Sequence, residues 1–114
     1  MGNCATVQVV CGEEFSPIAY VHWIGGDTLD VIEDAAPKMR SNDVSYAFAR
    51  LCGHLHLATG ALGALGFGVY NTDEIQTEDT VGDAGHYRVD LATGIVTNWS
   101  PEPADVATLK FFQG

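Results

Sequence analysis

Residues 41–60 read SNDVSYAFARLCGHLHLATG and carry the clearest helical pattern in the chain. Apolar side chains recur at the spacing of a single helix face, at Val44, Ala47, Phe48, Leu51, Leu55 and Ala58. Such a stripe has to be buried against another element, so this helix is expected to cover a core. Ser41 or Asn42 is expected to cap its start, and Gly60 is expected to end it.

The stretch before it, YVHWIGGDT at 20–28, predicts a strand that turns sharply into another helix. Gly25–Gly26 would make the turn, because glycine accepts positive φ, and Asp27 or Thr28 would cap the helix. Its apolar stripe is Leu29, Ile32, Ala35, Ala36 and Met39. Pro37 lies inside this pattern, so the helix is expected to end or kink just before it.

Strands are predicted on both sides of the two helices. Runs rich in β-branched and aromatic residues at Ala5–Val10, Ile18–Trp23 and Phe67–Tyr70 predict strands, and His86–Trp99 predicts a hairpin. Residues 101–114 suggest a short helix or a packed tail. The order β-β-α-α-β-β-β predicts a single α+β domain over 1–114, in which two helices cover one face of an antiparallel sheet of about five strands.

The charge balance excludes several classes of function. Fifteen acids and five bases give a formal net charge of −10 and a pI near 4.4. A nucleic-acid-binding protein needs a basic surface, and binding to anionic membrane needs one too, so neither is expected. No apolar run approaches a membrane span and no signal peptide is evident, so a cytoplasmic protein with free thiols at its three cysteines is expected. The charge instead suits solubility, a basic partner or imitation of a polyanion.

The candidate partner-binding residues are acids flanked by aromatic side chains. The acids lie in two polar segments and are Glu13, Glu14, Asp73, Glu74, Glu78, Asp79 and Asp83. Trp23 or Tyr70 could serve as an apolar anchor beside them, since interfaces favour aromatic anchors. Strand alternation sends His22 and Trp23 to opposite faces, so Trp23 could equally be an ordinary core residue.

Metal binding or catalysis is a second interpretation. Cys52 and His56 lie four residues apart on the second helix and could hold zinc with two further ligands. Those could come from the remaining cysteines or from His22 or His86, but no second closely spaced pair is present. Cys52 could also act as a nucleophile with His22 or His86 as its base. The simpler alternative is a core cysteine beside a boundary histidine, so no cofactor or metal is expected.

Four stretches resemble a family of small uncharacterised proteins of phages, prophages and their bacterial hosts: MGNCATV (1–7), AYVHWIGG (19–26), YAFARLCGHLH (46–56) and GHYRVD (85–90). Family members share a Met-Gly-Asn start, a His-Trp-Asn-Gly-Gly element and a Tyr-Ala-x-x-Arg helix, and this chain differs at Ile24. The resemblance implies an accessory gene of a mobile element and assigns no catalytic residue. By analogy, such small acidic proteins include anti-CRISPR and anti-restriction inhibitors of host defence.

The leading hypothesis is therefore a non-enzymatic accessory protein of the bacterial cytoplasm. Its acids would bind the basic groove of a host complex that handles nucleic acid, and it would not contact nucleic acid itself. Two alternatives stay open. One is a metal-supported or enzymatic domain built on Cys52 and His56, and the other is a self-assembling protein that pairs through a sheet edge and Phe111–Phe112.

Overall fold

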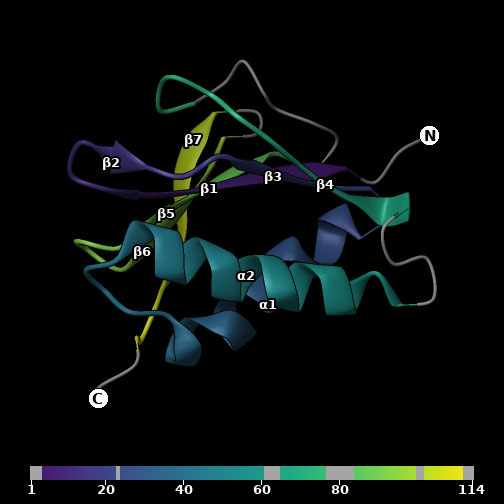
Figure 1. Ribbon diagram of the computed structural model, residues 1–114, viewed down its shortest axis with the longest axis horizontal. Coiled ribbons are helices and arrows are strands. Elements are labelled where there is room, and N and C mark those ends of the chain that lie inside the picture. The colour runs from purple at the N-terminus through teal and green to yellow at the C-terminus, as the bar shows by residue number, and fades with distance from the viewer. Residues whose placement is uncertain (1–3, 23, 61–64, 77–83, 100–101, 112–114) are drawn as a thin grey trace.

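The computed structural model describes residues 4–22, 24–60, 65–76, 84–99 and 102–111 and has two helices packed on one face of a sheet (Figure 1). The strands are β1 (Ala5–Cys11), β2 (Glu14–Phe15), β3 (Ile18–Val21), β4 (Phe67–Tyr70), β5 (His86–Asp90), β6 (Ile95–Trp99) and β7 (Pro103–Thr108). The helices are α1 (Thr28–Ala35) and α2 (Val44–Ala58), and two short 3-10 turns are η1 (Gly25–Asp27) and η2 (Ala36–Lys38). The α+β class with two helices is confirmed.

The sheet is mixed, so the prediction of a purely antiparallel sheet of about five strands is wrong. It has seven strands in the order β4-β3-β1-β5-β6-β7, and β2 pairs with β1. β1 and β5 run parallel, from Thr6 opposite His86 to Val10 opposite Asp90, whereas the other pairs are antiparallel. β1 and β4 run in the same direction because each is antiparallel to β3, and the crossing from β4 back to the centre of the sheet keeps that direction in β5.

Helix α2 follows the predicted stripe closely. Its buried side chains are Val44, Ala47, Phe48, Leu51 and Leu55, whereas Ala58, in the last turn, is exposed. The cap is Asp43, not Ser41 or Asn42, because the Asp43 carboxylate accepts a hydrogen bond from the Tyr46 amide at 2.9 Å. Gly60 follows the helix with a φ of 62°, as expected for a glycine that ends a helix.

The entry into α1 differs from the predicted positive-φ turn. Gly25 and Gly26 belong to the 3-10 turn η1, and Asp27 precedes α1 without a side-chain capping bond. Helix α1 ends at Ala35 as Pro37 requires, and η2 continues the chain to the fully buried Met39. Neither α1 nor α2, nor any other helix in the described part of the chain, is long and apolar enough to cross a membrane.

The C-terminal segment forms an edge strand rather than a helix. β5 and β6 make the predicted hairpin, and β7 then pairs with β6 from Trp99 opposite Pro103 to Ile95 opposite Thr108. Pro103 can begin this strand because an edge strand leaves one side of its backbone unpaired. Beyond β7, Leu109 is buried and Phe111 packs against the core, so the tail is anchored as well as paired.

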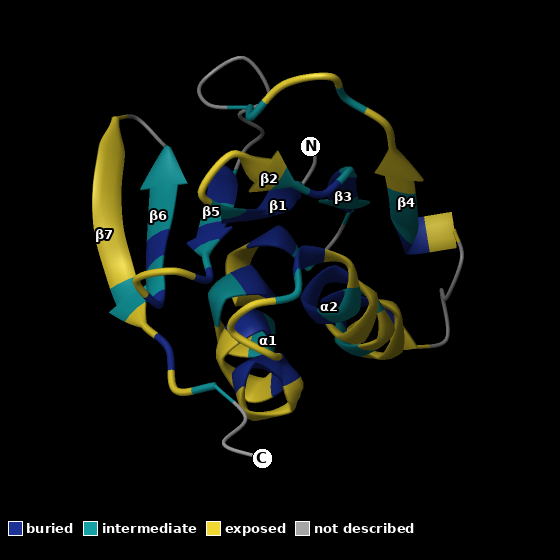
Figure 2. Ribbon diagram, turned by 60° about the vertical axis from the view of Figure 1, so that its left-hand side comes forward, coloured by how far each residue is buried: buried dark blue, intermediate teal, exposed yellow. Residues whose placement is uncertain are grey.

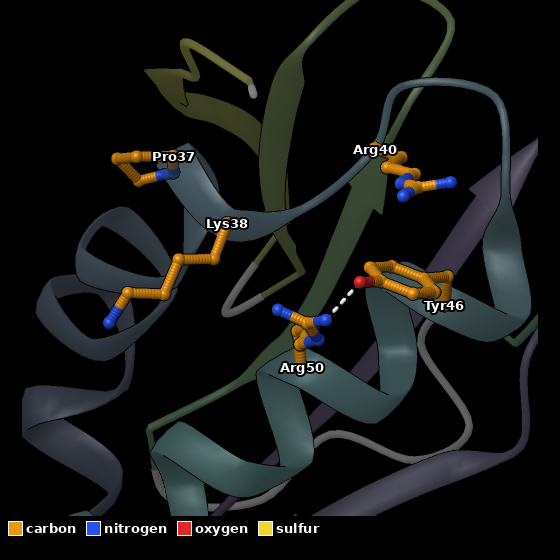
Figure 3. Close-up of a pocket in the computed structure, with 5 residues that line it drawn as sticks. All are labelled: Pro37, Lys38, Arg40, Tyr46 and Arg50. Atoms are coloured by element: carbon orange, nitrogen blue, oxygen red, sulfur yellow. Dashed lines mark hydrogen bonds between the residues drawn. The ribbon is translucent and has the colours of Figure 1, made fainter. Parts of the chain in front are cut away.

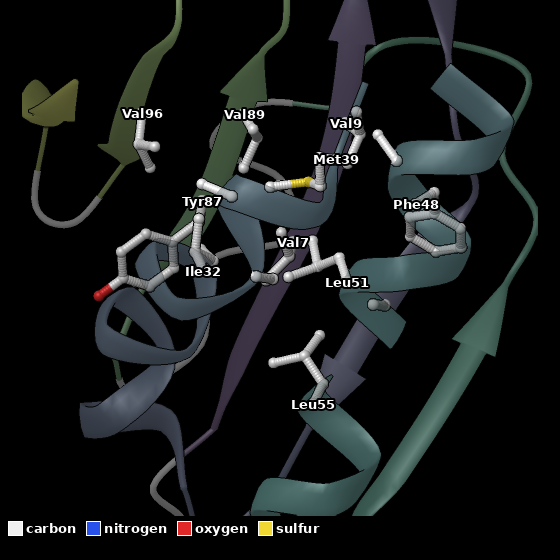
Figure 4. Close-up of a cluster of buried hydrophobic side chains, with 14 of the residues drawn as sticks. Val7, Val9, Ile32, Met39, Phe48, Leu51, Leu55, Tyr87, Val89 and Val96 are labelled. Atoms are coloured by element: carbon white, nitrogen blue, oxygen red, sulfur yellow. The ribbon is translucent and has the colours of Figure 1, made fainter. Parts of the chain in front are cut away.

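The core lies between the helices and the sheet (Figure 2). Figure 4 shows side chains of both layers meeting there: Val7, Val9, Tyr87, Val89 and Val96 from the strands, and Ile32, Met39, Phe48, Leu51 and Leu55 from the helical layer. β1 runs through the middle of this sheet, and six of its seven residues are buried. The helices cover one of its faces, and residues 74–76 cover the other at Gln8.

Two leucines of α2 test this packing. Leu51 is fully buried and Leu57 is 77% exposed. Leu51→Ala should lower the free energy of unfolding by about 2–5 kcal/mol, because it removes buried methyl groups and leaves a cavity. Leu57→Ala should change it by less than about 0.5 kcal/mol. Urea unfolding followed by circular dichroism measures both values, and equal losses would contradict this placement of α2.

Candidate functional site

The sheet face opposite α1 and α2, called here the outer face, is lined by polar side chains. Strand alternation places Thr6 and Gln8 of β1 and His86 and Arg88 of β5 on this face. After β4, the chain passes over the outer face before it returns to β5 (Figure 1). The described part of this crossing, residues 71–76, covers the polar side chains and buries several of them.

Gln8 joins two distant segments on the outer face. Its side-chain amide is fully buried and donates to the carbonyl of Ser16 at 2.8 Å and to that of Glu74 at 3.4 Å. Its Oε1 accepts from the amide of Gln76 at 2.8 Å. A buried amide group without partners would be costly, so these bonds hold the crossing segment beside the end of β2.

His86 lies beside Gln8 and is also fully buried. Its Nε2 donates to the Gln76 carbonyl at 3.2 Å, and its Nδ1 accepts from the Thr6 hydroxyl at 2.8 Å. Burial lowers the pKa of His86 to about 4. The nearby Arg88 charge also lowers this pKa, whereas the hydrogen bond to the Gln76 carbonyl raises it. The ring is therefore neutral at pH 7 with both nitrogens engaged, which suits a structural role better than metal binding.

Arg88 completes this polar layer. Its guanidinium lies 4.9 Å from the centroid of the Trp99 ring and reaches the Gln76 carbonyl at 3.5 Å. Burial lowers the pKa of Arg88, and the charge of Asp90 partly offsets that effect. The Gln76 carbonyl thus accepts from both His86 and Arg88, so the end of the described crossing is fixed to β5.

Of the predicted partner-binding residues, four acids lie on two segments of the chain. Glu13 and Glu14 lie at the β1–β2 turn, Asp73 and Glu74 lie on the crossing, and all four are exposed. Gln8 connects these two segments through Ser16 and Glu74. Glu14 pairs with Cys11, which packs against the core, so strand alternation turns Glu14 toward the helical side of the sheet. We call Glu13, Asp73 and Glu74 the outer acidic surface.

The other predicted partner-binding residues are placed as follows. Tyr70 is 44% exposed and pairs with Ile18, so it lies on the outer face where the crossing begins. Trp23, Glu78, Asp79 and Asp83 lie outside the described residues. Further exposed acids lie around α1 and belong to no predicted site: Asp27, Asp30, Glu33 and Asp34.

Cys52 and His56 do not form a joint site with the other candidates. Cys52 is half-buried against the core, and burial raises the pKa of its thiol to about 11. His56 is exposed and meets the ring of Phe67 edge to face, with centroids 6.1 Å apart. Across the described residues, no group of three or more His, Cys, Asp or Glu side chains is arranged to hold a metal ion.

The structure instead brings Cys4, Tyr20 and His22 together on the outer face. The Tyr20 hydroxyl donates to the Cys4 sulfur at 3.2 Å, and His22 Nδ1 lies 3.1 Å from that sulfur and 2.9 Å from the hydroxyl oxygen. The three groups can share protons. Alternation within the predicted strand puts Tyr20 and His22 on one face, but only the β1–β3 register, in which Ala5 pairs with Val21, adds Cys4 to that face.

No protein-family model, curated protein or solved structure that was compared with the chain matches it.

The buried His86 predicts a pH effect on stability. Because its pKa of about 4 lies below the ordinary 6.5, the unfolded chain takes up this proton first as the pH falls. The contribution of neutral His86 to the free energy of unfolding is complete above pH 6.5. Between pH 6.5 and pH 4 it falls by about 1.4 kcal/mol for each pH unit. His86→Gln should remove this slope from urea unfolding curves, whereas His56→Gln, at an exposed site, should keep it. Equal slopes in the parent chain and His86→Gln would contradict a neutral buried His86.

The burial of Cys52 predicts that its thiol reacts slowly with an alkylating reagent. A rise of the pKa from 9.0 to about 11 leaves about 100-fold less thiolate at pH 8, and thiolate is the form that reacts with iodoacetamide. Peptide mass spectrometry should therefore find Cys52 labelled at least about 100-fold more slowly in the folded chain than in denaturant. Labelling at the same rate in both states would contradict its burial and would revive its candidacy as a nucleophile.

Proposed function

We propose that the chain is a binding protein without catalytic activity, and that its outer acidic surface binds a basic surface of a partner protein. The observation that carries this proposal is the Gln8 side chain, which binds both Ser16 and Glu74. Through these bonds, acids from two segments about sixty residues apart in sequence present their charge on one side of the molecule. A fixed group of carboxylates attracts Lys and Arg side chains and selects against acidic partners.

The mechanism is electrostatic recognition with an apolar contact at its margin. Glu13, Asp73 and Glu74 are exposed, so their charges act on an approaching partner without prior rearrangement. Tyr70 begins the crossing segment and offers an exposed aromatic ring. Glu78, Asp79, Asp83 and Trp23 lie outside the described residues and stay predicted partner-binding residues.

The partner we favour is a host complex with a groove for nucleic acid. Such a groove is lined with basic side chains that contact phosphates, and a fixed set of carboxylates can occupy the same positions. The resemblance to a phage and prophage family supports a bacterial cytoplasmic setting and an anti-CRISPR or anti-restriction role. The proposed protein therefore competes with DNA or RNA for its partner and does not bind nucleic acid directly.

Paired charge reversals test the role of the outer acidic surface. Glu13→Lys with Glu74→Lys should reduce recovery of the partner from a bacterial lysate about tenfold, because the charges that attract the basic groove become repulsive. The matched control is Glu33→Lys with Asp34→Lys on α1. Each pair changes the net charge by +4, from −10 to −6. The control should recover the partner as well as the parent chain does.

The same pull-down at about 50 mM and about 500 mM salt separates charge-driven binding from other modes, because salt screens exposed charges. The partner should be recovered at low salt only and identified by mass spectrometry. Equal losses in both variants would point to net charge rather than this surface and would contradict the proposal. Recovery of the chain alone would favour self-assembly, which the mass of the parent chain in solution would then show.

A further inference from the structure

A second charged feature, of the opposite sign, lies on the helical side of the molecule. Figure 3 shows a pocket of about 160 Å³ between η2, the loop after it and α2. Its lining residues are Pro37, Lys38, Arg40, Tyr46 and Arg50. Three of the five Lys and Arg residues of this acidic chain thus surround one hollow. We call it the cationic pocket.

The local structure explains how these cations come together. Met39 is fully buried, and it fixes the loop whose exposed neighbours are Lys38 and Arg40. On α2, Tyr46 and Arg50 lie four residues apart, so they occupy neighbouring positions on one side of the helix. The next position of that row, His54, has its Nε2 3.3 Å from the Lys38 Nζ.

The Tyr46 ring orients both guanidinium groups. The guanidinium carbons of Arg40 and Arg50 lie 4.5 Å and 4.3 Å from the centroid of this ring. The Arg50 guanidinium also donates to the Tyr46 hydroxyl. Cation–π contacts of this kind place a guanidinium without neutralising its charge. The Asp43 carboxylate, which caps α2, accepts a hydrogen bond from the Tyr46 amide.

We propose that the cationic pocket binds a phosphoryl group, either as inorganic phosphate or as part of a small phosphomonoester. Three cationic side chains from two segments surround the hollow, and a tetrahedral dianion presents oxygens in several directions at once. A carboxylate is flat and is satisfied by one guanidinium fork, so it would leave the remaining cations unmatched. This site is separate from the outer acidic surface and does not depend on the function proposed for that surface.

Isothermal titration calorimetry at low ionic strength tests the proposal with four probes: inorganic phosphate, glucose phosphate, glucose and acetate. Phosphate and glucose phosphate should bind with a stoichiometry of one, glucose should give no binding, and acetate should bind more weakly. Tighter binding of glucose phosphate than of phosphate would identify a phosphomonoester as the ligand, and the reverse order would identify free phosphate. No saturable binding of either, or acetate as tight as phosphate, would overturn the proposal.

Variants locate the binding within the chain. Arg40→Gln and Arg50→Gln should each weaken phosphate binding about tenfold, since each removes a charged hydrogen-bond donor. Lys110→Gln removes the same charge from an exposed side chain that is not a lining residue, although it borders a neighbouring hollow that includes Pro37. At about 150 mM salt it should therefore weaken binding less than Arg40→Gln or Arg50→Gln does. Tyr46→Leu keeps the net charge and should still weaken binding, because both guanidinium groups lose their support. Circular dichroism confirms that each variant is folded, and parent-like binding by the Arg40 and Arg50 variants would overturn the assignment.

Discussion

The parallel pairing of β1 with β5 is the constraint on which the rest of the structure depends. β4 lies at the far edge of the sheet, beyond β3, so the chain has to cross the outer face to reach the place of β5 beside β1. That crossing carries Asp73 and Glu74, and it covers Gln8 and His86. If β5 had paired at the edge next to β4, a short turn would have sufficed, and the outer face would carry no such layer.

A crossing segment without regular structure needs partners for its backbone, and the outer face provides them. Gln8 donates to one of its carbonyls and accepts from one of its amides, and His86 and Arg88 both donate to the carbonyl of Gln76. These polar side chains stand where an ordinary sheet of this size would bury apolar ones. The outer face is therefore specific for one path of the chain, because any other path would leave buried polar groups without partners.

The sequence predicts what depends on local periodicity and misses what depends on distant pairing. The stripe of α2 and the bounds of β4 follow from spacing and β-branched residues, and the structure agrees with both. The parallel pair could not be predicted, because nothing local to β1 or β5 states which strand lies beside it. Asp43 was not predicted as the cap because Ser41, Asn42 and Asp43 are all good capping residues. Only the residue at which the helix begins, Val44, shows which of the three caps it.

The same distinction applies to the sites. Glu13, Asp73 and Glu74 could be named from composition, but the link between their two segments depends on Gln8, which reads as an ordinary polar residue within a strand. Cys4 and His22 were each named as possible zinc ligands to join Cys52. The sheet separates Cys4 and His22 from Cys52. Cys52 packs against the core on the helical side, whereas Cys4 and His22 lie on the outer face. The spacing of Tyr46, Arg50 and His54 could have indicated the cationic pocket, but the loop of Lys38 and Arg40 had to be placed first.

A net charge of −10 does not by itself exclude an anion site on this chain. At physiological salt, charges are screened over about 8 Å, and the molecule is 25 Å across in its shortest dimension. The outer acidic surface and the cationic pocket lie on opposite sides of the sheet, so a ligand at one feels mainly the charges around it. What matters for an anion is the local set of three cations, two of which are oriented by Tyr46, and what matters for a basic partner is the local set of three carboxylates. The two proposed sites would therefore act independently, and net charge alone would have concealed the second.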